Sequence, residues 1–264
     1  ARGDYGWLPP DDPVLSRPYA PADLADDLAR IGVSQTILVQ AAPSTEETEY
    51  LLGIADATPH VAKVVGWVDF EDPSQKATLE RLSRHPKSVG VRPMIQDIAD
   101  DDWMLRPELD WAFQTIIDLD LTFDCLGLPR HLGNFHQLLV RYDKMRAVLD
   151  HCLKPQFEQQ DVFRAWADGM TALAEDTGDC CKISGLVTEA SQDWSDDVLR
   201  PYVTHVIEAF GPSMLMFGSD WPVCLLRCEY AAWTALAKRL TSHLEEGAIS
   251  EIFSGTARRF YRTG

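Results

Sequence analysis

The sequence predicts an α/β protein in which helices cover a parallel β-sheet. Short apolar, β-branched runs alternate with longer amphipathic stretches along the chain. The runs are too short and too continuously apolar for half-exposed antiparallel strands, so buried parallel strands fit them better. Seven strands in strict alternation with helices nearly make a (β/α)8 barrel, a fold of roughly 250 residues. We therefore expect residues 1–264 to form a single domain of this kind.

The expected strands share their apolar, β-branched character and cover residues 35–42, 61–70, 88–95, 121–126, 145–152, 181–186 and 214–217. The expected helices carry apolar residues at helical spacing, and several begin with Pro, Ser, Thr or Asp, as helix starts commonly do. They cover residues 21–31, 46–57, 74–84, 107–119, 132–142, 162–174, 195–210, 230–244 and 250–261.

The eighth strand of such a barrel should come first in the chain. Residues 1–34 contain a proline-rich loop and a helix, and we expect no strand there. The first strand is therefore expected upstream of Ala1. An open, doubly wound sheet of seven strands is the alternative, but it would more often carry a glycine-rich phosphate turn after its first strand. No such motif occurs, which weakens the nucleotide-binding interpretation.

Composition limits the possible partners. The chain is 45% hydrophobic and 25% charged, which suffices for a large core. Its net charge of −17 argues against a nucleic-acid partner, which usually requires a basic surface. No apolar run approaches the roughly 20 residues that cross a membrane. The six cysteines form no CxxC pair, so we expect free buried thiols and a cytoplasmic location.

Ionisable residues recur at or near the ends of the expected strands; they are Arg92, Asp124, Asp150, His151, Lys182 and Asp220. In parallel α/β proteins the carboxyl ends of the strands form the ligand-binding face. Charges within apolar strands are costly to bury unless they are paired or used in chemistry. The pattern therefore predicts an active site at that face.

Each of these residues also has a structural interpretation. Because side chains alternate along a strand, a His151 that faces the barrel interior would direct Asp150 toward the helices. Asp124 could be the acid that holds Arg92. Lys182 could be an exposed or snorkelling side chain. The Asp220 carboxylate could cap the next helix, bind a metal or act as a general base.

Four motifs then indicate a family. They are Asp-His-x-x-Lys-Pro at 150–155, Cys-Lys-Ile-Ser-Gly at 181–185, Phe-Gly-Ser-Asp-Trp-Pro at 217–222 and Gly-Thr-Ala-Arg-Arg-Phe-Tyr at 255–261. In combination they resemble the amidohydrolase superfamily (amidohydrolase-related family 2), in particular its lactonase branch. That branch includes fuconolactone and rhamnonolactone hydrolases, sulfomuconolactone hydrolase and pyrone-dicarboxylate lactonase. The resemblance covers essentially the whole chain and implies a (β/α)8 TIM barrel.

The resemblance also implies roles for individual residues. Asp220 matches the aspartate of the family's last strand and His151 a strand-end histidine, so we expect both to be catalytic, with Asp220 as general base. Arg92 matches a substrate-orienting arginine. Asp124 could bind sugar hydroxyl groups, and Trp7 and Trp221 could form an apolar wall against a sugar face.

The metal requirement stays open in this interpretation. The family carries a His-x-His pair at the end of its first strand, and no such pair occurs here. We expect it upstream of Ala1, where it would join the candidate ligands His151 and Asp220. One divalent ion, zinc or manganese, and metal-independent catalysis are equally compatible with the lactonase branch.

The predicted function is hydrolysis of a lactone ring, with a sugar-acid lactone favoured over an anionic muconolactone. The partner is then a small-molecule substrate, and no feature of the chain indicates an oligomeric state. A metal-dependent decarboxylase or amide hydrolase of the same superfamily is the first alternative. A barrel that binds ligands without catalysis is the alternative from another class.

Overall fold

A computed structural model of the chain describes residues 5–8, 11–157, 160–190 and 194–263, and its centre is a sheet of seven parallel strands. Strands that follow one another in sequence are also neighbours in the sheet; they are β1 (Thr36–Val39), β2 (Val61–Gly66), β3 (Ser88–Val91), β4 (Thr122–Cys125), β5 (Arg146–Leu149), β6 (Cys180–Ile183) and β7 (Leu215–Phe217). A doubly wound sheet would reverse its strand order partway. The uninterrupted order therefore confirms the barrel prediction.

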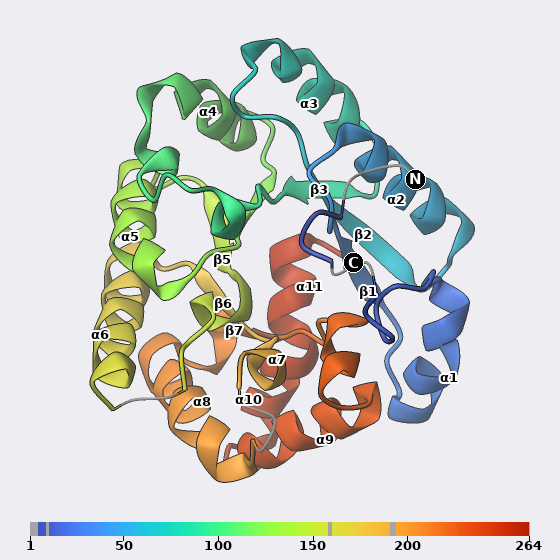
Figure 1. Cartoon of the computed structure of the whole chain (residues 1–264), viewed down its shortest axis with the longest axis vertical. Coiled ribbons are helices and arrows are strands. Elements are labelled where there is room, and N and C mark those ends of the chain that lie inside the picture. Colours follow the sequence, from blue (N-terminus) through green and yellow to red (C-terminus); the bar gives the residue numbers. More distant parts are fainter. Residues whose placement is uncertain (1–4, 9–10, 158–159, 191–193, 264) are drawn as a thin grey trace.

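Helices surround the strands as an outer ring (Figure 1). The α-helices are α1 (Pro21–Ile31), α2 (Thr45–Ala57), α3 (Lys76–Ser83), α4 (Asp110–Asp118), α5 (Leu132–Arg141), α6 (Gln160–Thr177), α7 (Leu186–Glu189), α8 (Asp196–Phe210), α9 (Tyr230–Leu240), α10 (Glu246–Ser250) and α11 (Thr256–Tyr261). The expected helix at 250–261 is interrupted, because a π-helical turn at Glu251–Gly255 separates α10 from α11.

The strand side chains alternate between two apolar layers. Val64 and Leu149 belong to the large cluster between the sheet and the helices. Val65 and Val148, their neighbours in sequence, belong to a smaller cluster inside the barrel. Tyr261 of α11 completes that inner cluster, and Figure 1 shows α11 within the ring of outer helices. These side chains therefore form an apolar layer inside the barrel.

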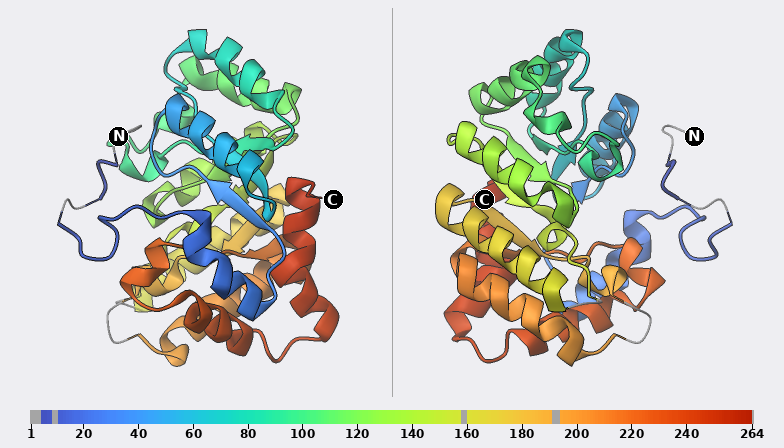
Figure 2. Two further views of the ribbon diagram at one scale, coloured as in Figure 1. Left: turned by 90° about the vertical axis from the view of Figure 1, so that its right-hand side faces the viewer. Right: turned by 60° about the vertical axis from the view of Figure 1, so that its left-hand side comes forward.

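A long segment before α1 lies over the ends of β1 and β7. The Trp7 indole donates a hydrogen bond to the carbonyl of Ala41, just beyond β1, at 2.8 Å. The ring of Tyr19 meets that of Trp221, beyond β7, edge-on at 5.1 Å between centroids. Figure 2 shows this segment projecting from one side of the barrel. It therefore forms part of the rim of the site.

Two sequence-based expectations concern the whole chain. Among the residues that the structure describes, no helix is long and apolar enough to cross a membrane. All six cysteines are free, and five of them are buried, as predicted.

Candidate active site

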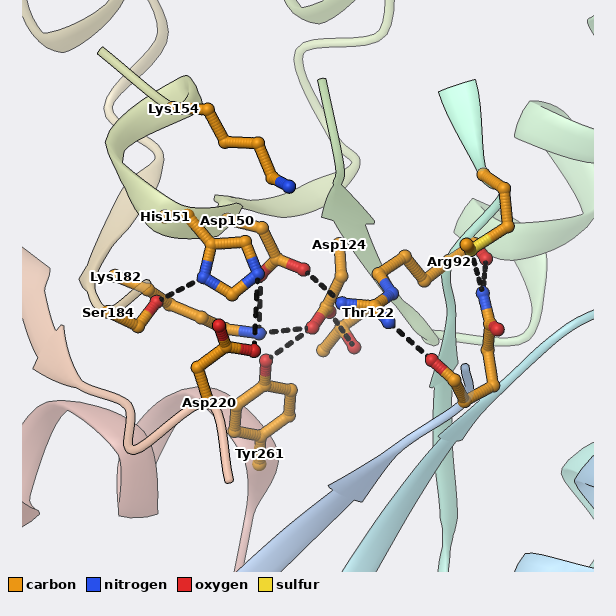
Figure 3. A network of polar contacts seen from close by, with 12 residues as sticks. Arg92, Thr122, Asp124, Asp150, His151, Lys154, Lys182, Ser184, Asp220 and Tyr261 are labelled. Atoms are coloured by element: carbon orange, nitrogen blue, oxygen red, sulfur yellow. Dashed lines mark hydrogen bonds and ion pairs between the residues drawn. The ribbon is translucent and has the colours of Figure 1, made fainter. Parts of the chain in front are cut away.

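A cavity of about 700 Å³ reaches the carboxyl ends of the strands and extends between β1 and β7 toward α11. Its polar lining includes Arg92 beyond β3, His151 beyond β5, Ser184 beyond β6 and Asp220 beyond β7. Figure 3 shows these side chains converging from separate strands. The structure therefore brings together three of the residues singled out from sequence, Arg92, His151 and Asp220.

The turn after β5 places His151 in the cavity. β5 ends at Leu149, and the four residues from His151 to Lys154 all have left-handed backbone conformations, with φ between 50° and 55°. Such a conformation costs roughly 1–2 kcal/mol per non-glycine residue. The Trp166 indole stabilises the turn by donating a hydrogen bond to the carbonyl of Cys152 at 2.8 Å.

This turn overturns the prediction that Asp150 and His151 face opposite layers. Both residues line the cavity, and Asp150 does not face the helices. Alternation applies only within a strand. The expected strand at 145–152 ends three residues early, so the alternation rule does not reach Asp150.

A chain of ion pairs runs from the cavity wall, which includes Arg92, Asp150 and Lys182, to the buried Asp124. Arg92 Nη1 lies 2.9 Å from Asp150 Oδ2, and Lys182 Nζ lies 2.6 Å from Asp150 Oδ1. The same ammonium lies 2.6 Å from Asp124 Oδ2. The Asp150 and Asp124 side chains are at most 1% exposed. Two cations and two carboxylates therefore neutralise one another where isolated charges would be costly.

The network changes how two of its members titrate. Burial disfavours the charge on Asp150, but the Lys182 and Arg92 cations hold the pKa of that carboxyl below its usual range. Burial likewise opposes the charge on Lys182, but Asp124 and Asp150 raise the pKa of its ammonium well above the usual value. Both groups therefore stay charged across the physiological range.

Three expectations are corrected by this network. The interpretation of Lys182 as an exposed or snorkelling side chain is wrong, because its side chain is only 10% exposed. Arg92 is held by Asp150 and not by Asp124. Asp124, predicted to bind substrate, is fully buried, and the cavity lining does not include it. Its Oδ2 instead accepts a hydrogen bond from the Tyr261 hydroxyl at 2.7 Å, so Asp124 serves as an internal strut.

His151 is positioned by Ser184 and faces Asp220. Its Nδ1 lies 2.8 Å from the Ser184 hydroxyl, and its Nε2 lies 3.9 Å from Asp220 Oδ1. Burial lowers the pKa of His151 to about 3, so the imidazole is neutral near pH 7. When the Ser184 hydroxyl donates to Nδ1, the imidazole proton resides on Nε2, which faces Asp220.

Asp220, which directly follows Ser219, has a left-handed backbone conformation with φ 53°. Its side chain is 20% exposed. Burial raises the pKa of Asp220 to about 7, against the partial opposition of Lys154 and Arg92. The 3₁₀ turn that follows begins after Pro222 and has no side-chain cap, so helix capping does not explain the carboxylate.

The two predicted aromatic residues lie at the rim. Trp7 and Trp221 both line the cavity. Trp7 is 37% exposed, and Trp221 is partly covered by Tyr19. Both are therefore open to a ligand that enters from the mouth.

Sequence reasoning did not predict site roles for Ser184, Lys154 and Glu189. Lys154 Nζ pairs with Glu189 Oε1 at 3.1 Å, and both line the cavity. One signal was available for Ser184, because the expected strand at 181–186 places it on the same face as Lys182. Lys182 and Ser184 are both polar in an apolar run, which indicates that this face meets a polar interior.

Comparison with known proteins identifies the family. The family model described as "Amidohydrolase" matches residues 3–263, which is nearly the entire chain. The chain belongs to the amidohydrolase family.

Its relatives include proteins with a named activity. An L-fucono-1,5-lactonase of Burkholderia ambifaria is 41% identical over 268 residues, covering 99% of this chain and 91% of the relative. An L-fucono-1,5-lactonase of Burkholderia multivorans is 35% identical, covering 98% and 90%. A crystal structure of a Burkholderia multivorans amidohydrolase with bound zinc superposes with a TM-score of 0.93 at 33% identity, covering 99% of this chain and 96% of that one.

The donor set of this amidohydrolase is too small for a closed metal site. Across residues 5–263, apart from the short gaps in the description, no three His, Cys, Asp or Glu side chains are grouped closely enough to hold an ion. A catalytic zinc commonly takes three protein ligands. His151 and Asp220 are two candidates, and the His-x-His pair expected upstream of Ala1 lies outside the described residues. The residues present therefore do not fit a metal by themselves.

Gly185 tests how strictly this amidohydrolase needs its histidine in place. A Cβ on Gly185 would lie 2.7 Å from His151 Nδ1, and the residue has a left-handed φ of 65°. We expect Gly185→Ala to lower kcat/KM by about 10²-fold, because the imidazole must move. The control is Gly133→Ala in α5, where a Cβ meets nothing within 4 Å. Steady-state kinetics should show the control unchanged, and equal activity of both variants would contradict the prediction.

Proposed function

We propose that this amidohydrolase opens the ring of a sugar-acid lactone, with Asp220 as the general base. The observation that carries the proposal is a partly exposed carboxyl group at the end of the last strand, with its pKa raised to about 7 and His151 Nε2 beside it. A base with a pKa near the working pH is the most effective one. The two relatives named L-fucono-1,5-lactonase support the lactone as the substrate class.

The reaction has two steps. In the first, Asp220 takes a proton from water while the water oxygen bonds to the lactone carbonyl carbon, and the carbonyl electron pair moves to its oxygen. In the second, that electron pair re-forms the carbonyl and the bond from the carbonyl carbon to the ring oxygen breaks. Asp220 then returns the proton to the ring oxygen, which gives the hydroxy acid.

The neighbouring side chains bind and orient the lactone. The Nε2–H of neutral His151 donates a hydrogen bond to the carbonyl oxygen as it becomes negative. Trp7 and Trp221 offer apolar faces to the sugar ring at the rim of the cavity. Arg92, whose side chain is 11% exposed and fixed by Asp150, orients the substrate from the base of the site.

The charge balance favours a neutral sugar lactone over an anionic muconolactone. Arg92 and Lys182 are compensated by Asp150 and Asp124. An anionic substrate would therefore find no uncompensated cation at the base of the cavity. L-Fucono-1,5-lactone is the first candidate, since both named relatives carry its name.

A panel of lactones tests the proposal. L-Fucono-1,5-lactone, other aldonolactones, a muconolactone and a simple amide are offered, and acid release is followed with a pH indicator. We expect the highest kcat/KM on a neutral aldonolactone. Turnover of the amide alone would favour the amide-hydrolase alternative, and binding without turnover would favour the non-catalytic barrel.

The pH dependence of kcat/KM follows from the protonation state of Asp220. The base must be ionised, and its pKa is raised to about 7. We expect kcat/KM to fall about tenfold per pH unit below that value. His151, with its pKa lowered to about 3, adds no second limb between pH 5 and 8.

Asp179 provides a matched control for this limb. Burial raises its pKa to about 7 as well, but it precedes β6 at the opposite end of the barrel, where it accepts a hydrogen bond from the Ala147 amide. Asp179→Asn should keep the wild-type pH profile. A profile that is flat in the wild type, or that disappears in Asp179→Asn, would contradict the assignment to Asp220.

We also infer a cytoplasmic location. The support is the set of six free thiols, two of which are adjacent at Cys180 and Cys181. Free thiols that are not paired in disulfides suit a reducing compartment. The proposed partner is the small-molecule substrate.

A further inference from the structure

The cavity contains a second ion pair that the proposed mechanism does not use. Lys154 Nζ lies 3.1 Å from Glu189 Oε1, and the pair joins the turn after β5 to the short helix α7 after β6. Both residues line the same cavity as His151 and Asp220. The pair therefore forms part of the wall of the cavity that contains the proposed base.

Exposure distinguishes this pair from the chain of ion pairs that reaches Asp124. The Lys154 and Glu189 side chains are 20% and 28% exposed. The carboxylates that hold Arg92 and Lys182 are at most 1% exposed. Releasing either of those buried cations would leave a buried charge unpaired, which is strongly unfavourable. Lys154 can leave its partner at lower cost, because Glu189 can be hydrated in its place.

The backbone directs Lys154 toward the reacting groups. Its amide donates a hydrogen bond to the carbonyl of His151 at 2.8 Å, and its φ of 52° continues the left-handed turn. Figure 3 draws its side chain extending toward His151 and Asp150. Burial raises the pKa of Asp220, and the Lys154 ammonium is the charged group that opposes this rise most.

Hydrolysis of a lactone produces negative charge that such a cation can stabilise. A neutral lactone first acquires a negative charge on its carbonyl oxygen and ends as a carboxylate. We propose that Lys154 is a catalytic residue that exchanges Glu189 for the substrate: its ammonium binds the carbonyl oxygen as that oxygen becomes negative, and then the carboxylate of the product. This inference rests on the proposed lactone hydrolysis. The inference adds Lys154 to the mechanism as a cation. Glu189 neutralises this cation before the substrate binds and releases it as negative charge develops on the carbonyl oxygen.

Substitution of Lys154 and substitution of Glu189 should change the affinity for the product in opposite directions. We expect Lys154→Met to lower kcat by about 10²–10³-fold, as loss of an oxyanion donor does, and to weaken binding of the aldonate product. Lys154→Arg should recover part of kcat. Glu189→Gln removes the competitor, so the product should bind more tightly. Lys144→Met, which alters an exposed lysine before β5, is the matched control and should change neither quantity.

Steady-state kinetics and product inhibition by the aldonate measure both effects on the best lactone of the panel. Opposite changes in product affinity support the exchange. A pair that only braces the two loops would give changes of the same sign in Lys154→Met and Glu189→Gln, which would overturn the inference, as would an unchanged kcat in Lys154→Met. Should Lys154→Met fail to fold, tighter product binding in Glu189→Gln still supports the exchange, and unchanged binding overturns it. A wild-type enzyme that opens no lactone refutes the proposed function instead.

Discussion

Asp220→Asn should reduce kcat/KM for the preferred lactone by roughly 10²–10⁴-fold, the range that general acid–base catalysis contributes. The amide is close in size to the carboxylate, so the turn after β7 should be retained. It cannot accept a proton from water near pH 7, because a neutral amide has no basic oxygen of comparable strength. Kinetics at pH 7 should therefore show the loss mainly in kcat, with a folded protein by circular dichroism.

Asp97→Asn is the matched control for this experiment. Asp97 also follows a strand, β3, but it is exposed and does not line the cavity. Its removal should leave kcat/KM within about twofold of the wild type, because surface substitutions away from such sites have small effects. An Asp220→Asn variant with activity equal to that of Asp97→Asn would remove Asp220 from the mechanism.

Lys182→Met should produce the largest loss of stability. The substitution leaves Asp150 without its Lys182 contact at 2.6 Å and Asp124 without its only cationic partner among the described residues. Removing one member of a buried ion pair costs about 3–5 kcal/mol, because the other charge stays buried. Urea unfolding should show that decrease in the free energy of unfolding, whereas Lys144→Met, on an exposed lysine, should differ by less than about 0.5 kcal/mol.

A second substitution separates charge from packing. In Lys182→Met with Asp124→Asn, the uncompensated carboxylate is removed, so part of the lost free energy should return. Contacting residues couple by roughly 0.5–3 kcal/mol in such cycles. If the double variant lost at least as much free energy of unfolding as the two single variants added together, the loss would come from packing and not from the unpaired charge.

The positions of the strands could be predicted because apolar content is local information. Six of the seven expected strands contain an observed one, and the expected strand at 181–186 overlaps β6, which begins one residue earlier at Cys180. The observed strands are shorter, mostly at their carboxyl ends, where polar residues turn away from the ladder to line the cavity. The ends of the strands therefore depend on the site, which a periodicity argument does not include.

The contacts within the site were harder to predict, since they join residues far apart in sequence. Lys182 and Asp124 are 58 positions apart, and so are Arg92 and Asp150. A single sequence shows that each residue is ionisable and lies in an apolar run, but not which partner it meets. The roles of Asp150 and Lys182 were misjudged for this reason, whereas Asp220 and His151 were placed in the cavity correctly because position at a strand end was sufficient.

The hydrogen bond from Tyr261 to Asp124 also has a consequence for synthesis of the protein. Asp124 belongs to β4, and its hydroxyl donor belongs to α11, 137 residues later. A nascent chain emerges from the ribosome in order, so the ionic centre around Asp124 cannot be completed until all seven described strands and α11 have been translated. Before then, Asp124 and Lys182 lack the Tyr261 side chain that covers them inside the barrel. This ionic centre is therefore completed only after α11 has been translated, when the outer helices that precede it have had time to form.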